Sequence, residues 1–147
     1  MAVNGGGDVY VRFATETQSR CSRAFEGIFV AAYQVRSDTS VERALRREIA
    51  ERIEWFERNL RVPPIVKTGR FPNGICWFQG GASGHIRTAW ELSVLLETSG
   101  VLMQRLWTSA PGDLLYRDDV QIVARPRRHD IRWAQLTGKG VERRFAR

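Results

Sequence analysis

Apolar residues alternate with polar or small residues close to the start of the chain. Residues 9, 11 and 13 are apolar and share one side of an extended segment, whose other side holds Tyr10, Arg12 and Ala14. A period of two is typical of a β-strand. The pattern therefore predicts a strand over residues 9–17.

Three later segments rich in apolar residues predict three helices, and the second has its apolar residues at helical spacing. The first covers residues 25–35. The second starts at Thr39, because Thr39 and Glu42 have the spacing of a capping box, and it ends near Leu60. The third covers residues 85–98, with Ser83 as its N-cap and Gly100 just past its end.

The second helix has the clearest two-sided pattern. One face is an apolar stripe made of Val41, Leu45, Ile49, Ile53, Phe56 and Leu60. The other face carries acid–base pairs four residues apart, which are Glu42–Arg46, Glu48–Arg52 and Glu54–Arg58. Because these charges largely neutralise one another, we interpret the polar face as a solvent-exposed surface and not as a binding surface.

The remaining apolar segments predict strands. Residues 75–78 are apolar on both faces, which is typical of a buried central strand and makes Cys76 a buried thiol. Three more strands are expected over residues 101–108, 114–116 and 120–124, with a turn at Pro111-Gly112 and a hairpin around Asp118-Asp119. The order β-α-α-β-α-β-β-β predicts an α+β fold. We expect a mainly antiparallel sheet of four or five strands, about three helices packed on one face, and a basic C-terminal extension.

Length and cysteine content limit the classes of protein to consider. A chain of 147 residues is the size of one domain, and 43% hydrophobic residues is an ordinary globular composition. Two cysteines that are 55 positions apart make neither a disulfide framework nor a zinc motif, so we expect a cytoplasmic protein. Residues 1–8 lack the apolar segment of a signal peptide, and no apolar run is long enough for a membrane span.

The net charge of +7 is concentrated at the C-terminus. Residues 125–147 hold eight cations and two acids, whereas residues 1–124 hold 15 cations and 14 acids. We therefore divide the chain into a globular domain, residues 1–124, and an Arg-rich tail, residues 125–147. Charge that is set apart from the body of a domain indicates a polyanionic partner, DNA or RNA first. The residues expected to contact phosphates are Arg125, Arg127, Arg128, Arg132, Lys139, Arg143 and Arg144, with Trp133 stacking on bases and Lys67 and Arg70 extending the surface.

Several short motifs occur in an order that resembles a set of short, uncharacterised bacterial proteins. The motifs are Tyr10-Val11-Arg12-Phe13, Gly27-Ile28-Phe29, Trp55-Phe56, Gly74-Ile75-Cys76-Trp77-Phe78, His85-Ile86, Pro111-Gly112, Leu115-Tyr116, Asp118 and Gln121-Ile122-Val123-Ala124 followed by Pro126. The resemblance spans about residues 9–126 and implies no activity. Members of that set end soon after the position of Pro126, so the basic tail departs from their pattern.

Other residues suggest chemistry inside the predicted domain. A glycine-rich loop before the third helix is a candidate anion site, made of Gly81, Ser83, Gly84, His85 and Arg87. A capping loop with a surface histidine explains the same residues. Cys76, His85 and Asp118 have the residue types of a nucleophile, a base and an orienting acid, although a core thiol explains Cys76 better. Asp113, Asp118 and Asp119 suit Mg²⁺, but a hairpin turn explains the aspartate pair equally well.

These patterns favour a non-catalytic binding protein without cofactor or metal, whose tail contacts nucleic-acid phosphates without sequence specificity. It could be a small subunit of a larger complex. One alternative is a protein-interaction or inhibitor module whose tail docks on an acidic protein surface. A second alternative is a small nuclease or phosphoryl-transfer enzyme that uses His85 and the Gly80–Gly84 loop.

Overall fold

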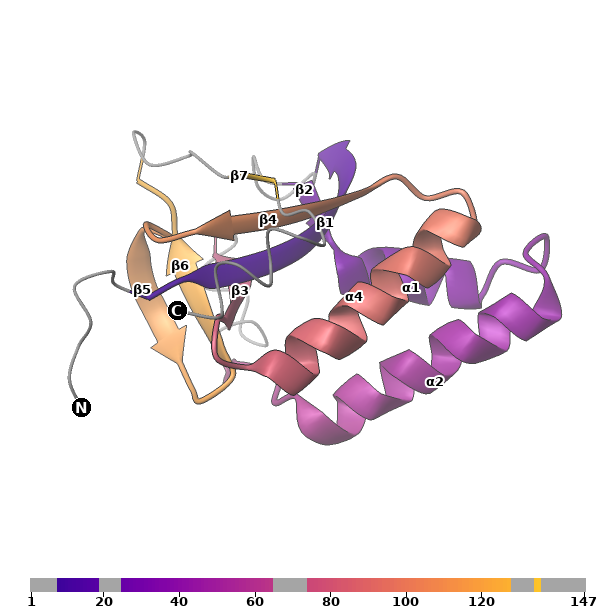
Figure 1. Ribbon diagram of the computed structural model, residues 1–147, viewed down its shortest axis with the longest axis horizontal. Helices are drawn as coiled ribbons and strands as arrows, with labels where there is room; N and C mark the ends of the chain where they lie inside the picture. Colours follow the sequence, from indigo (N-terminus) through magenta and orange to yellow (C-terminus); the bar gives the residue numbers. More distant parts are fainter. Residues whose placement is uncertain (1–7, 19–24, 65–73, 128–133, 136–147) are drawn as a thin grey trace.

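Three helices and an antiparallel sheet form the structure, a computed structural model that describes residues 8–18, 25–64, 74–127 and 134–135 (Figure 1). The helices are α1 (Ile28–Arg36), α2 (Arg43–Asn59) and α4 (Ser83–Thr98). The strands are β1 (Tyr10–Gln18), β2 (Phe25–Gly27), β3 (Ile75–Gln79), β4 (Met103–Thr108), β5 (Asp113–Arg117), β6 (Gln121–Arg125) and β7 (Ala134–Gln135). The predicted α+β class with an antiparallel sheet is confirmed.

The strands lie in the order β5-β6-β3-β1-β4-β7, and every neighbouring pair is antiparallel. One side of β1 pairs with β4 from Tyr10 to Thr15. The other side of β1 is shared, because β3 pairs with Tyr10 and Val11 while β2 pairs with Ala14 and Gln18. The short strands β2 and β7 come in addition to the five predicted strands. They have 3 and 2 residues, too few to show a period in the sequence.

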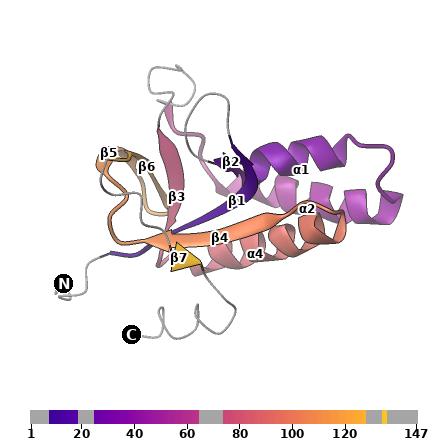
Figure 2. The same cartoon turned by 90° about the horizontal axis from the view of Figure 1, so that it is seen from above.

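Side chains are buried on both faces of the sheet. Val11, Phe13 and Phe78 point toward the helices and share a cluster with Ile49 of α2 and Leu92 of α4. The opposite face carries a second cluster, whose members all come from strands: Tyr10, Ala14, Ile75, Trp77, Leu106, Ile122 and Ala124. The alternation predicted for the first strand is thus confirmed. All three described helices lie on one side of the sheet, as Figure 2 shows.

The C-terminus of α4 is closed by the predicted glycine. Gly100 has a φ of +101°, which is the left-handed conformation that glycine adopts without strain. Its N–H donates to the carbonyl of Glu97 at 3.0 Å, and the N–H of Val101 donates to the carbonyl of Leu96 at 3.0 Å. These two bonds make a Schellman motif, so the predicted end of the helix is confirmed.

The N-termini of α2 and α4 differ from their predictions. Glu42 and Ala82 are the N-caps, and neither helix has a side-chain cap hydrogen bond. Before α2, the carboxylate of Asp38 accepts hydrogen bonds from the N–H and the hydroxyl of Ser40, at 2.9 and 2.6 Å. An aspartate side chain competes with helix formation by binding nearby N–H groups. Thr39 therefore belongs to a turn, and the predicted capping box does not form.

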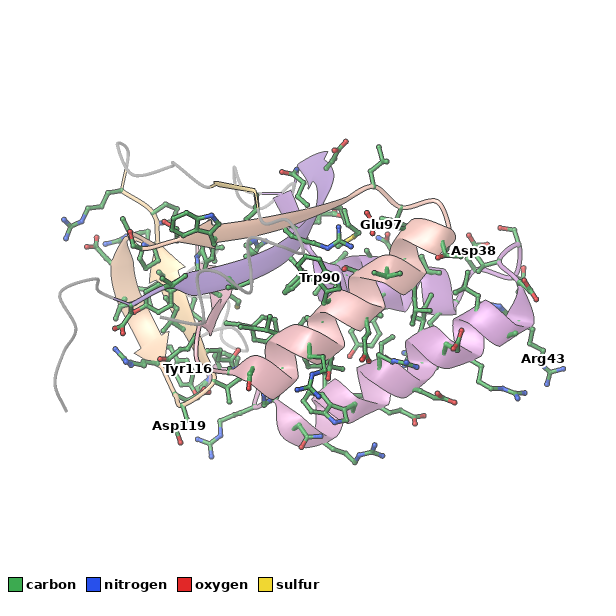
Figure 3. The ribbon with its side chains drawn as sticks, viewed as in Figure 1. Asp38, Arg43, Trp90, Glu97, Tyr116 and Asp119 are labelled. Atoms are coloured by element: carbon green, nitrogen blue, oxygen red, sulfur yellow. The ribbon has the colours of Figure 1, made fainter. Side chains whose placement is uncertain are left out.

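The hairpin of β5 and β6 is fixed at its turn by one carboxylate. Asp118 Oδ1 accepts hydrogen bonds from the N–H groups of Val120 and Gln121, at 2.8 and 2.9 Å. Asp118 Oδ2 accepts the hydroxyl proton of Tyr116 at 2.8 Å, and Figure 3 shows Tyr116 beside this turn. Partial burial raises the pKa of Asp118, but these hydrogen bonds together lower it by more. The pKa of Asp118 is therefore below its ordinary value. The predicted hairpin is confirmed.

Candidate functional site

The tail begins at the end of β6 with two ion pairs. Arg127 Nη2 lies 2.7 Å from Asp113 Oδ1, and Arg125 Nη2 lies 3.8 Å from Asp113 Oδ2. The hydrogen bond from Arg127, aided by both positive charges, lowers the pKa of Asp113. The arginine side chains remain 55% and 68% exposed. Both guanidinium groups are therefore accessible to an anion that competes with Asp113.

Farther along the tail, β7 pairs with the sheet. Ala134 lies opposite Trp107 of β4, and Gln135 lies opposite Leu106 (Figure 2). The other tail residues expected to contact nucleic acid lie outside the described residues, and so do the two loop cations: Arg128, Arg132, Trp133, Lys139, Arg143, Arg144, Lys67 and Arg70. Their contribution to one basic surface stays a prediction.

The glycine-rich loop predicted to hold an anion lies at the start of α4. Gly81, Ser83, Gly84 and Arg87 are all exposed. A Cβ atom added at Gly81 or Gly84 would meet no atom within 4 Å. The described residues thus form an open turn here, without walls that would exclude water from an anion. The anion site stays a prediction.

His85 has a structural partner. Its Nε2 lies 2.8 Å from the carbonyl oxygen of Asn59, and its ring packs edge-on against Trp55 with 4.9 Å between centroids. The side chain thereby joins the start of α4 to the end of α2. The carboxylate of Asp118 is bound within its own hairpin turn. Neither group contacts Cys76 through a described hydrogen bond, so the described interactions do not assemble a nucleophile–base–acid triad.

A pocket that the sequence reasoning missed lies where β1 changes its partner from β3 to β2. Its volume is about 330 Å³, at the lower end of the range for small-molecule sites. Its lining is largely apolar and includes Phe13, Phe29, Leu60 and Phe78. On this side of β1, neither β3 nor β2 pairs with the strand between Val11 and Ala14, and the pocket lies at this gap.

Among the described residues that line the pocket, Arg12 is the charged one. Its Nη1 donates a hydrogen bond to the carbonyl oxygen of Cys76 at 3.0 Å, across the gap between β1 and β3. Burial lowers the pKa of Arg12 to about 10, and the nearby sulfur of Cys76 opposes that change. The sequence did carry a signal, because Arg12 occupies the same side of the strand as the buried residues Tyr10 and Ala14.

Cys76 differs from its prediction as a core thiol. The residue is exposed and lines the pocket, although nearby side chains crowd its sulfur enough to raise the pKa of the thiol. The neighbouring residues Ile75 and Trp77 are buried, as expected for a central strand. By alternation, Cys76 lies on the same side of β3 as Phe78, and both residues line the pocket.

The described residues offer neither a metal-binding cluster nor a membrane-spanning helix. No group of three or more His, Cys, Asp or Glu side chains is arranged there to hold a metal ion. None of the helices in these segments has the length and apolar character needed to cross a membrane.

Comparisons with known proteins add no identity to this picture. The chain matches no family model, no curated protein and no solved structure. The resemblance to short bacterial proteins stays a prediction, and the function has to be argued from the charges, pockets and contacts of this chain.

Proposed function

We propose that this chain is a non-catalytic nucleic-acid-binding protein of the cytoplasm. Its C-terminal tail contacts the phosphates of DNA or RNA without reading sequence, and the globular part positions the tail or engages a protein partner. The observation that carries the proposal is the excess of six positive charges in residues 125–147, against an excess of one in residues 1–124. Counterion release makes such a segment bind any polyanion at low salt.

The contacts of the described residues support separate roles for the tail and the globular part. Within the part of the chain that the structure describes, both buried clusters consist of residues between Tyr10 and Ala124. Arg125 and Arg127 extend from the end of β6 and are more than half exposed. In this proposal phosphates replace Asp113 as their partner, since a guanidinium binds phosphate and carboxylate by the same paired hydrogen bonds. Trp133 stacks on unpaired bases.

A charge-matched comparison tests the proposal. The first variant carries Arg128→Gln, Arg132→Gln and Arg143→Gln in the tail. The control carries Arg43→Gln, Arg47→Gln and Arg58→Gln on the exposed face of α2, where Figure 3 shows Arg43 pointing away from the rest of the molecule. Both variants lose three positive charges at unchanged chain length. This length is kept because residues 134–135 pair with β4.

The measurement is the affinity for fluorescent single- and double-stranded DNA and RNA between about 50 and 300 mM salt. The tail variant should bind duplex DNA more weakly, and its plot of log affinity against log salt should lose a slope of roughly three. The α2 variant should keep most of the wild-type slope. Equal loss in both variants would show that net charge alone attracts the polyanion, and undiminished binding by the tail variant would refute the proposal.

A second function is favoured by one specific contact. The two described arginines of the tail are held by a carboxylate, that of Asp113, so the tail could equally dock on an acidic protein surface. Wild-type protein that binds no nucleic acid at the lowest salt, yet binds polyglutamate through the same tail residues, would establish this alternative.

A further inference from the structure

The pocket beside β1 combines features that small-molecule sites share. Its walls come from separate parts of the chain. Strand β1 supplies Arg12 and Phe13, the start of α1 supplies Phe29, the segment after α2 supplies Leu60, and β3 supplies Phe78. Apolar walls with a few polar groups are typical of sites that bury most of a small ligand. In this pocket the polar groups include one permanent cation.

The position of Arg12 determines which ligand charge the pocket suits. Its Nη1 is fixed by the carbonyl of Cys76 at 3.0 Å, which orients the planar guanidinium. Gly27 lines the pocket next to this group, and a Cβ atom there would contact Arg12 Nη2 at 3.7 Å. Gly27 has a φ of −70°, which any residue adopts, so backbone conformation alone does not require glycine at this position.

The apolar lining restricts the anion further. A phosphate monoester carries nearly two negative charges at neutral pH, and a single arginine would leave one of them in apolar surroundings. A carboxylate carries one charge and matches the guanidinium with two parallel hydrogen bonds. The aromatic and aliphatic walls then suit a hydrocarbon or aryl group on the same ligand.

We propose that this pocket binds a small organic monocarboxylate, whose carboxylate contacts Arg12 and whose apolar body lies against Phe13, Phe29, Leu60 and Phe78. The inference is independent of the function proposed for the tail, and the tail variant described above should bind the acid as the wild type does.

Octanoate and 1-octanol are suitable probes, because they have the same chain length and differ in charge. Isothermal titration of the full-length protein at pH 7.5 should give one octanoate per chain, with at least about tenfold higher affinity than 1-octanol. Arg12→Met should abolish the preference for the acid while 1-octanol still binds. Gly27→Leu keeps the arginine but fills the space beside it, and it should weaken both probes.

Three results would overturn the proposal. They are no binding of octanoate at millimolar concentration, equal affinity of the wild type for acid and alcohol, and an undiminished preference for the acid in Arg12→Met. Because Arg12→Met could fail to fold, a measurement on the wild type is added. Octanoate should slow alkylation of Cys76 by iodoacetamide more than 1-octanol does, since Cys76 lines the same pocket. Equal rates with both probes would count against an anion beside Arg12.

Discussion

Backbone torsion and steric space require glycine to different degrees at different positions in this fold, and alanine substitution measures the difference as a loss of stability. Gly112 has a φ of +109°, and a Cβ atom there would lie 2.1 Å from the carbonyl oxygen of Arg125. Gly100 has a φ of +101°, but the space around it is open. Gly81 has neither constraint. We expect alanine to cost about 2 kcal/mol or more at Gly112, about 1 kcal/mol at Gly100 and little at Gly81.

Urea denaturation of the three alanine variants measures these free energies of unfolding. The comparison separates the torsional penalty, present at Gly100 and Gly112, from the backbone collision that exists at Gly112 alone. Equal losses at Gly100 and Gly112 would mean that β5 and β6 shift apart at low cost, which would contradict the close approach described here.

The ionisation of Asp118 should make the stability of the fold depend on pH. Its pKa is lowered in the folded protein, so its carboxylate stabilises the fold above the pKa of the unfolded chain, and this contribution is lost as pH falls through the folded value. Asp118→Asn keeps one acceptor oxygen but loses the acceptor for the Tyr116 hydroxyl. We expect this variant to lose about 1 kcal/mol of unfolding free energy at pH 7. Between pH 5 and pH 2, its unfolding free energy should then fall less than that of the wild type.

Asp119→Asn is the control for this experiment, because the adjacent Asp119 is exposed and points away from the hairpin in Figure 3. Thermal unfolding followed at each pH gives both curves. Parallel acid profiles for the wild type and Asp118→Asn would show that other carboxylates dominate the acid sensitivity.

At the scale of whole elements, α4 is attached to β4 by one arginine. Arg105 of β4 donates to Ser93 Oγ at 2.9 Å and to Glu97 Oε2 at 3.3 Å, and its guanidinium lies 4.6 Å from the ring centroid of Trp90. Trp90 and Glu97 both project from α4 in Figure 3. The arginine side chain is 14% exposed, whereas that of Glu97 is 41% exposed. The contact therefore includes packing as well as charge.

Replacing either partner should separate packing from charge. Arg105→Lys keeps the charge but loses the planar stack and the fork of donors, and we expect it to cost about 1–2 kcal/mol. Glu97→Gln removes only a partly exposed charge, and we expect less than about 1 kcal/mol, decreasing further in high salt. Chemical denaturation at low and high salt measures both. A larger loss from Glu97→Gln than from Arg105→Lys would mean that the ion pair dominates.

The same scale shows how far the sequence predicts this fold. The pattern of apolar residues located the long elements well, since α2 carries an apolar stripe on one face and the strand at Ile75 is a short run that is apolar on both faces. The capping prediction at Thr39 was wrong because Asp38 binds the N–H and the hydroxyl of Ser40 in its own turn. The one at Ser83 was wrong because α4 already includes Ser83 and has Ala82 as its N-cap. The sequence predicts Phe25 in a helix, but it belongs to β2, whose pairing with Gln18 is a tertiary contact that no local pattern contains.

For the molecule as a whole, candidate sites are harder to predict than elements. The charge of the tail is visible in the sequence because it needs only counting. The pocket is not visible in the sequence, because it arises where the pairing partner of β1 changes from β3 to β2. There Arg12 contacts the backbone of Cys76, which is 64 residues away in the chain. The sequence predicts Cys76 in the core for the same reason, since an apolar neighbourhood in sequence does not reveal a gap between strands.

The pairing of β7 with β4 gives the basic tail a second consequence, for self-association. An outermost strand offers unpaired N–H and C=O groups to any other chain, and natural sheets protect such strands with charge or by covering them. Ala134 and Gln135 cover part of β4 here, and they lie within the most positively charged segment of the chain. A polyanion that drew residues 134–135 off the sheet would at once expose β4 and neutralise the repulsion between copies. Binding and oligomerisation along a nucleic-acid strand would then be coupled through a two-residue strand.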